Sequence, residues 1–290
     1  MRKQHYKIPF TGLKLGVHDF SFKVTETFFE SDDYLEIEKK GEYTIIQMNR
    51  PKVNAINFQM VKEIREAFKL MEEDITVSGV ILTGREGVFS AGLDLIELYD
   101  YDKTKIREFF IAFGLMYIEL ARFSKPFICA ITGHSPAGGT VIAITSDYRV
   151  MAEGEKYGIG LNEVAVNVQI STNLIEAYSF WLGQSLAYRF VLEGKLLNSE
   201  EALKANLVDE VLPIEEVLPQ AEKRMKHFLT ADKNIWLNTK TKLRSEWLNK
   251  LNDQNEEELE EALKIWWSPE VRMKMQMFKA MLAAKKNNSI

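Results

Sequence analysis

Residues 127–146 read FICAITGHSPAGGTVIAITS, and this stretch decides the fold. It starts with an apolar run of strand length, passes through a turn that holds three glycines, and ends in a second apolar run. An apolar run that stops at glycine predicts a buried strand over residues 127–132, and the run after the glycines predicts a helix over residues 138–146. A buried strand that leads directly into a helix is typical of α/β proteins with largely parallel sheets.

The same alternation of strands and helices continues on both sides of this stretch. Two short β-like runs joined by a lysine-glycine pair predict an antiparallel hairpin near the start of the ordered chain. Asn57 is expected to cap a helix, because apolar side chains recur after it at steps of three and four. The expected elements are, in chain order, strands 34–39 and 42–48, a helix after Asn57, strand 80–82, helix 103–122, strand 127–132, helix 138–146 and strand 147–151.

The C-terminal part of the sequence has a different character, because strand patterns stop and tryptophans appear among charged residues. We expect these helices to dock either on the main domain or on another subunit. Ser268, Pro269 and Glu270 supply a cap, a first-turn proline and an acid at the positive end of a last helix. The expected organisation is an N-terminal extension over residues 1–33, a core domain over residues 34–230 and a helical region over residues 231–290.

Composition limits the kinds of partner. The chain has 290 residues with 37 basic against 42 acidic side chains, and its net charge of −5 gives no general attraction to nucleic acid or to anionic membranes. No apolar run reaches the ~20 residues that a membrane span requires, and no secretory signal is recognisable. The expected location is cytoplasmic, with a mitochondrial or peroxisomal location left open.

The cysteine and histidine content limits the chemistry. The single cysteine, Cys129, excludes an internal disulfide framework, and its apolar neighbours predict a buried structural thiol. The four histidines lack metal-ligand spacing, so no metal site is expected. His134 is interpreted as a hydrogen-bonding residue of its loop. Asp147 and Arg149 are interpreted as structural charges.

Two glycine-containing loops are the candidates for ligand binding. Residues 87–95 read GVFSAGLDL and residues 133–140 read GHSPAGGT, and each follows an expected strand. Glycine allows a ligand to approach the backbone closely. The second loop opens into a helix, whose first N–H groups are unpaired and can stabilise a developing oxyanion. Tight turns that need glycine would explain either loop equally well when it is taken alone.

Taken together with residues 160–163 (GLNE), the two loops resemble the crotonase (enoyl-CoA hydratase/isomerase) family, and within it the mitochondrial-type Δ3,Δ2-enoyl-CoA isomerases. The resemblance covers roughly residues 34–290. It implies a crotonase-type spiral of repeated β-β-α units, followed by helices that associate into trimers or hexamers. It also implies an acyl-CoA thioester as the substrate. No separate cofactor is expected, because coenzyme A is part of that substrate.

The resemblance assigns roles to individual residues. It implies that the backbone amides of Leu93 and Gly138 form an oxyanion hole around the thioester oxygen. The family's first catalytic glutamate position falls on Val141, which cannot activate water, and the second falls on Glu163. Coenzyme A is expected along the first loop, and the residues implied to bind it are Ser90, Ala91, Gly92 and Asp94.

The chemistry explains how one carboxylate can suffice. Glu163 would remove a proton from C2 of a 3-enoyl thioester and return it at C4, which shifts the double bond without consuming water. Hydration needs a water to be activated while a proton is delivered, which favours two acids. To work near neutral pH, Glu163 should lie in a partly apolar pocket that raises its pKa.

Two further features are open to more than one interpretation. Residues 166–171 (VNVQIS) are more polar than the glycine and apolar residues common at this place in the family that the chain resembles. This would suit a short or functionalised acyl group, but capping of the following helix is the preferred explanation. Lys279, Lys285 and Lys286 are candidates for contacts with a 3′-phosphate, but a solvated helical face explains them more simply.

Three competing functions remain. Ser135 approximates a nucleophile elbow, and Asp209 and His227 follow in the order of a serine hydrolase. A protein that binds acyl-CoA without turnover is a second alternative. A hydratase that works with one carboxylate is the nearest one, and it differs from an isomerase by releasing a 3-hydroxyacyl product.

Overall fold

The computed structural model describes residues 34–252 and 255–287, with side chains up to residue 281. The extension over residues 1–33 and the side chains of Lys285 and Lys286 lie outside the described residues. Within the described part, no helix is both long and apolar enough to cross a bilayer.

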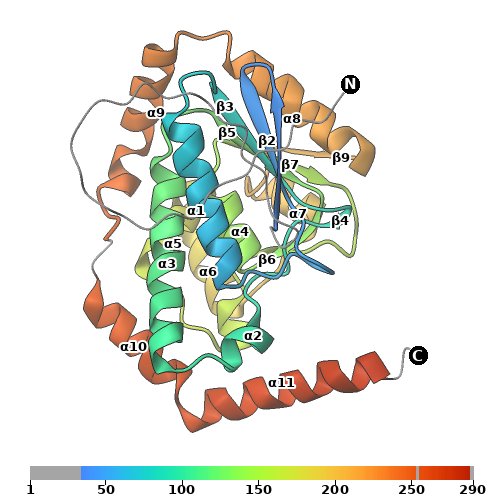
Figure 1. Cartoon of the computed structure of the whole chain (residues 1–290), viewed down its shortest axis with the longest axis vertical. Coiled ribbons are helices and arrows are strands. Elements are labelled where there is room, and N and C mark those ends of the chain that lie inside the picture. The colour runs from blue at the N-terminus through green and yellow to red at the C-terminus, as the bar shows by residue number, and fades with distance from the viewer. Residues whose placement is uncertain (1–33, 253–254, 288–290) are drawn as a thin grey trace, which may run out of the picture.

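A six-stranded sheet forms the centre of the molecule (Figure 1). The first two strands form an antiparallel hairpin, which confirms the prediction, and the remaining neighbours pair in parallel. Gly41 turns the hairpin with a φ of 66°, a value that favours glycine. In sheet order the strands are β1 (Leu35–Lys40), β2 (Tyr43–Met48), β3 (Gly79–Thr83), β5 (Phe127–Ile131), β7 (Tyr148–Ala152) and β9 (Glu210–Leu212).

A second, smaller parallel sheet was not expected from the sequence. It consists of β4 (Gly87–Val88), β6 (Gly133–Pro136) and β8 (Ile159–Gly160), in that order. Two of these strands have only two residues, so they show no side-chain periodicity, and β6 lies inside a segment interpreted as a turn. Three successive windings, which begin at β3, β5 and β7, each contribute a strand to the large sheet, a short strand to the small sheet and then a helix. This is the expected crotonase-type spiral.

Helices cover both faces of the large sheet. On one side α1 (Phe58–Glu73) and α3 (Lys103–Arg122) lie side by side (Figure 1). On the other side α8 packs on β3, β5 and β7. The other helices are α2 (Leu95–Tyr99), α4 (Gly138–Ala143), the 3-10 helix η1 (Glu163–Val166), α5 (Thr172–Leu182), α6 (Gln184–Glu193), α7 (Ser199–Lys204), α8 (Ile214–Phe228), α9 (Lys233–Leu248), α10 (Glu256–Trp266) and α11 (Pro269–Asn287).

Local sequence explains where these helices begin and end. The Asn57 side chain accepts a hydrogen bond from the Met60 amide at 2.9 Å, as predicted for the cap of α1. The helix expected over residues 138–146 was too long. It ends at Ala143, and the hydroxyls of Thr145 and Ser146 turn back to donate to carbonyls three residues earlier.

Cys129 lies in the buried core, as predicted. Its side chain is fully shielded from solvent, and this burial raises the pKa of the thiol to about 12. The thiol is therefore a packing group rather than a reactive one.

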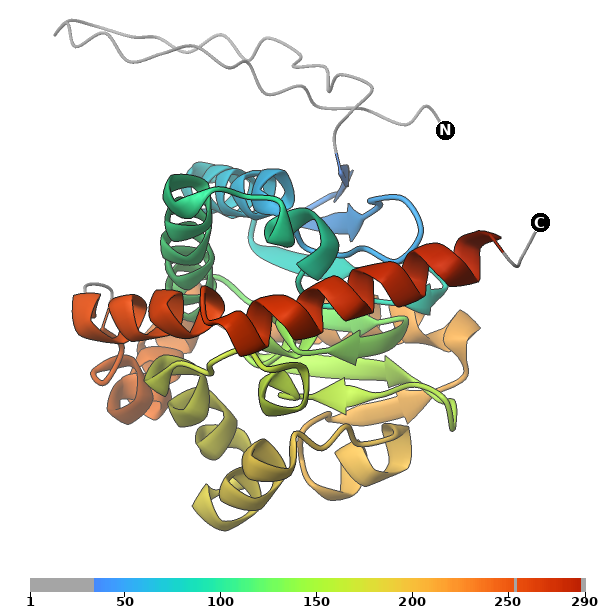
Figure 2. The ribbon, with the colours of Figure 1, turned by 90° about the horizontal axis from the view of Figure 1, so that it is seen from below.

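The C-terminal helices dock on the core of their own chain through buried cations. Lys240 and Arg244 of α9 are buried, and each contacts the Asp147 carboxylate at 2.8 Å, whose side chain is 9% exposed. Arg244 also donates to the Thr145 carbonyl at 2.9 Å. Figure 2 shows the next part of this region, α10 and α11, extending across the molecule beyond the small sheet. Asp147 is thus a structural charge, as interpreted from the sequence.

Replacement of Asp147 by asparagine is expected to destabilise the protein by about 3–5 kcal/mol, because two buried cations lose their counter-charge. Urea unfolding measures the change. The control is Glu176→Gln, which removes the partner of Lys250 in a more exposed ion pair and should cost at most ~1 kcal/mol. Equal effects of the two substitutions would contradict the structural role of Asp147.

Candidate active site

The small sheet brings the three predicted loops to one edge. Because carboxyl ends of parallel strands meet at the same edge, the residues that follow β4, β6 and β8 are neighbours. The Ala137 amide donates to the Gly160 carbonyl at 2.9 Å, and the Phe89 amide donates to the His134 carbonyl at 3.0 Å. Leu93, Gly138 and Glu163 are thereby placed around one cavity.

The first two loops touch where the oxyanion hole was expected. A Cβ on Gly92 would lie 3.1 Å from the Pro136 carbonyl oxygen and 3.4 Å from the Gly138 nitrogen, and the φ of 80° at this residue also favours glycine. Ala137 has a φ of 44°, a strained value that turns the chain sharply into α4.

Two backbone amides on these adjacent loops have no partner within residues 34–252 and 255–287. The Ile56 amide donates to the Gly92 carbonyl and the Asp94 amide donates to the Ile56 carbonyl, so both flanks of Leu93 are fixed. Among the described residues, neither the Leu93 amide nor the Gly138 amide donates to a protein group. Such a pair can stabilise an enolate oxygen.

The four residues expected to bind coenzyme A differ in the contacts that they make. Ala91 lines the cavity, and Gly92 forms the contact between the loops. The Ser90 hydroxyl is buried and donates to the Asn54 carbonyl at 2.7 Å. The Asp94 carboxylate caps α2 and pairs with Arg50 at 2.7 Å. The Ser90 and Asp94 amides are paired as well, with the His134 and Ile56 carbonyls, so neither the side chains nor the amides of these two residues are left for a ligand.

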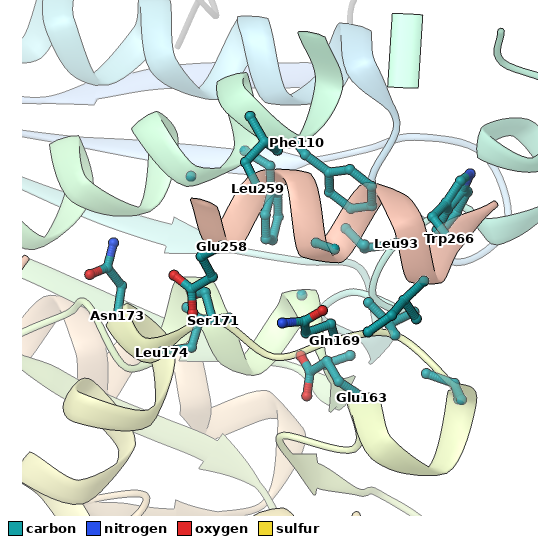
Figure 3. Close-up of a pocket in the computed structure, with 18 of the residues that line it drawn as sticks. Leu93, Phe110, Glu163, Gln169, Ser171, Asn173, Leu174, Glu258, Leu259 and Trp266 are labelled. Carbon is teal, nitrogen blue, oxygen red and sulfur yellow. The ribbon is translucent and has the colours of Figure 1, made fainter. Parts of the chain in front are cut away.

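Glu163 extends from the start of η1 into the cavity (Figure 3). Its side chain is buried, and its Oε2 has no hydrogen-bond partner among the described residues. Burial without a compensating cation raises the pKa of this carboxyl to about 7. A carboxyl with such a pKa can accept and return a proton near neutral pH.

The cavity beside Glu163 has a volume of about 680 Å³ and lies between α3, α10 and the segment from Asn162 to Leu174. The Phe110 and Trp266 rings meet edge to face at 5.4 Å on its wall. Sequence analysis did not identify the wall residues on α3 and α10, because their apolar side chains were indistinguishable from core. The apolar wall residues include Leu93, Phe110, Phe113, Leu174, Leu259 and Trp266.

The preferred explanation of the polar segment over residues 166–171 was wrong. Ser171 lies at the cap position of α5, but its side chain makes no capping bond. Instead, Gln169 donates to Glu261 of α10 at 3.0 Å, and Asn167 accepts from Lys274 of α11 at 2.6 Å. The polar residues attach the C-terminal helices above the cavity.

The serine hydrolase candidates do not come together. Ser135 is fully buried, and its hydroxyl has no partner among the described residues. Asp209 pairs with Arg149 at 3.0 Å, while His227 lies exposed near the end of α8. His134 accepts a hydrogen bond from the Gly158 amide at 2.8 Å, in agreement with its interpretation as a loop residue.

The structure also shows the surroundings of two other predicted positions, Val141 and Lys279. Val141 is buried in α4, so the position of the family's first glutamate is apolar here. Lys279 pairs with Asp100 at 2.6 Å, which supports the simpler interpretation of a charged surface. The described residues contain no group of three or more side chains that could hold a metal ion.

Comparisons with known proteins agree with this fold and site. The family described as enoyl-CoA hydratase/isomerase matches residues 38–285. Enoyl-CoA delta isomerase 1, mitochondrial, from Rattus norvegicus is 35% identical over 77% of this chain and 78% of that protein. A probable mitochondrial enoyl-CoA hydratase from Dictyostelium discoideum is 33% identical over 68% of this chain and 70% of that protein.

A solved structure shows the same architecture. The human mitochondrial Δ3-Δ2-enoyl-CoA isomerase superposes with a TM-score of 0.83 at 27% identity, covering 88% of this chain and 100% of that one. The fold and the convergent loops therefore define a crotonase-type enzyme. The chain belongs to the enoyl-CoA hydratase/isomerase family.

The raised pKa of Glu163 predicts a pH-dependent effect on stability. Between its ordinary pKa of 4.5 and about 7, the folded state keeps a proton that the unfolded state releases, so stability falls as pH rises through this window. Glu163→Gln removes the cost of burying the charge. It should stabilise the protein by up to about 3 kcal/mol at pH 8 and by much less at pH 4.

Urea unfolding of wild type and Glu163→Gln at the two pH values tests this expectation. A stability difference between the two proteins that does not change with pH would show that Glu163 does not titrate in a shielded site.

Proposed function

We propose that this protein is a Δ3,Δ2-enoyl-CoA isomerase that converts 3-enoyl-CoA into 2-trans-enoyl-CoA. The observation that carries the proposal is the buried carboxyl of Glu163, whose Oε2 has no partner among the described residues, in one cavity with the equally unpartnered Leu93 and Gly138 amides and with valine at position 141. The similarity to the rat and human isomerases supports it. The similarity to a hydratase makes hydration the competing reaction.

The mechanism is a proton transfer in two steps. The thioester oxygen accepts hydrogen bonds from the Leu93 and Gly138 amides. Glu163 takes a proton from C2, and the electrons of that C–H bond form a dienolate whose negative charge the amides stabilise. Glu163 then returns the proton to C4, the thioester carbonyl forms again, and the double bond now joins C2 and C3. No oxidant, metal or water is consumed.

Val141 argues against hydration. A hydratase must hold and deprotonate a water while a proton is delivered to C2. The valine side chain offers no hydrogen bond at the position where the family resemblance implies a second glutamate, and it is 1% exposed. The remaining carboxylates on the cavity wall, Glu256 and Glu258, belong to α10, and Glu258 accepts from the Thr172 amide at 2.6 Å.

The proposal also covers coenzyme A, the oligomeric assembly of the protein and its location in the cell. Coenzyme A enters as part of the substrate and no separate cofactor is required. Exposed apolar side chains on α6, Tyr188 and Leu192, support association into a homotrimer or hexamer. The mitochondrial names of the relatives favour a mitochondrial location over the cytoplasmic one expected from composition.

Replacement of Glu163 by glutamine should lower turnover of 3-hexenoyl-CoA at least about 100-fold, because the amide cannot accept the C2 proton. Ser135→Ala is the control and should retain activity, whereas a serine hydrolase would lose it. The assay follows the conjugated thioester and identifies the product. The same assay is run with 2-hexenoyl-CoA as the substrate. If the protein converts it mainly into 3-hydroxyhexanoyl-CoA, the protein is a hydratase instead.

The pH dependence of turnover tests the same carboxyl. Glu163 must be ionised to accept a proton, so kcat/KM for 3-hexenoyl-CoA should fall tenfold per pH unit below an apparent pKa of about 7. A profile that stays flat down to pH 5 would exclude Glu163 as the base.

A further inference from the structure

Gly114 lies in the middle of α3, a twenty-residue helix, where glycine is less favourable than alanine. Packing does not require it. A Cβ built on Gly114 would meet no atom within 4 Å, whereas one on Gly133 would lie 2.2 Å from the Gly87 carbonyl. Gly114 instead lines the cavity beside Glu163. The missing side chain therefore leaves open space inside the substrate site.

The position of Gly114 along the cavity follows from helix geometry. Phe110 and Ile118, which also line the cavity, lie one helical turn before and after it, about 6 Å away along the axis. Phe110 contacts Trp266, and Figure 3 shows both near Leu93 at the reacting end. The part of the cavity wall formed by α3 therefore runs from the oxyanion hole past Gly114 toward Ile118.

The opposite end of the cavity is polar. Next to Ile118, the Tyr117 hydroxyl donates to the Asn173 carbonyl at 3.0 Å, and the Asn173 side chain donates to the Asn252 carbonyl at 3.0 Å. Asn252 is exposed at the surface. The apolar part of the cavity therefore continues past Gly114 toward a polar end near solvent, rather than stopping at an apolar wall.

We propose that Gly114 determines the acyl chain length that the enzyme accepts, by letting the tail of a long acyl group pass beside α3 toward the polar end. This proposal rests on the proposed function, since it takes the thioester to lie at Leu93 and Gly138. Short acyl groups end before Gly114 and make no contact there. A larger side chain at this position would fill the space that a long tail needs.

The test compares binding of two saturated acyl-CoA thioesters, hexanoyl-CoA and dodecanoyl-CoA, by titration calorimetry, which does not depend on turnover. Gly114→Leu should weaken dodecanoyl-CoA binding at least about tenfold, the effect of a methylene-sized misfit in an apolar pocket, and leave hexanoyl-CoA binding within about twofold. Turnover of 3-dodecenoyl-CoA and 3-hexenoyl-CoA should show the same split.

Two further variants complete the experiment. Glu108→Leu adds a leucine at an exposed position of the same helix, away from the cavity, and should leave the binding of both thioesters unchanged. Gly114→Ala favours the helix and should keep or raise the melting temperature, with a smaller bias against the longer chain. If the leucine variant does not fold, the alanine variant supplies the result.

Equal effects on both chain lengths in a folded Gly114 variant, or no effect on either, would overturn the proposal. The outcomes also separate it from the proposed function. Wild type that binds both thioesters without isomerising 3-hexenoyl-CoA would refute the isomerase, while the binding ratio of the Gly114 variants would still support or overturn the role of Gly114.

Discussion

The active site depends on backbone pairing between three very short parallel strands. β4, β6 and β8 contribute two to four residues each, and the segments that follow them carry Glu163 and the two amides that have no partner among the described residues. The contact is close: a Cβ on Gly133 would lie 2.2 Å from the Gly87 carbonyl. The Thr140 hydroxyl accepts from the Gly160 amide at 2.8 Å and so joins α4 to the strand that precedes Glu163. Main-chain hydrogen bonds thus position the chemistry, which explains why glycines recur here.

The large elements were predictable from the sequence because they are long enough to show periodicity. The hairpin, the helix capped by Asn57 and the helix over residues 103–122 were found close to their observed bounds. The small sheet was not predictable, since a strand of two residues has no pattern and glycine has no side chain to show burial. The end of α4 was missed because Ile144 continues the apolar run, while the hydroxyls of Thr145 and Ser146 already bond backward.

For the site, the resemblance to the family supplied the positions and the structure supplied their surroundings. Nothing in the residues around Glu163 distinguishes a buried base from a surface glutamate, because the shielding comes from distant parts of the chain. The polar residues before α5 illustrate the same limit. Their partners, Glu261 and Lys274, lie about 90 and 110 residues away, so local reasoning preferred a cap.

The surroundings of Glu163 therefore include residues that lie far from it in the sequence. Its pKa is raised because the carboxyl is buried, and the cavity that it lines is formed partly by α10, which lies about 90 residues further along the chain. The preceding helix α9 is anchored by Lys240 and Arg244 on Asp147 at the start of β7. Asp147 directly precedes β7, the long strand of the winding that also carries Glu163. An ion cluster that lines no part of the cavity thus anchors α9, and the helix that follows, α10, forms part of the cavity wall beside Glu163.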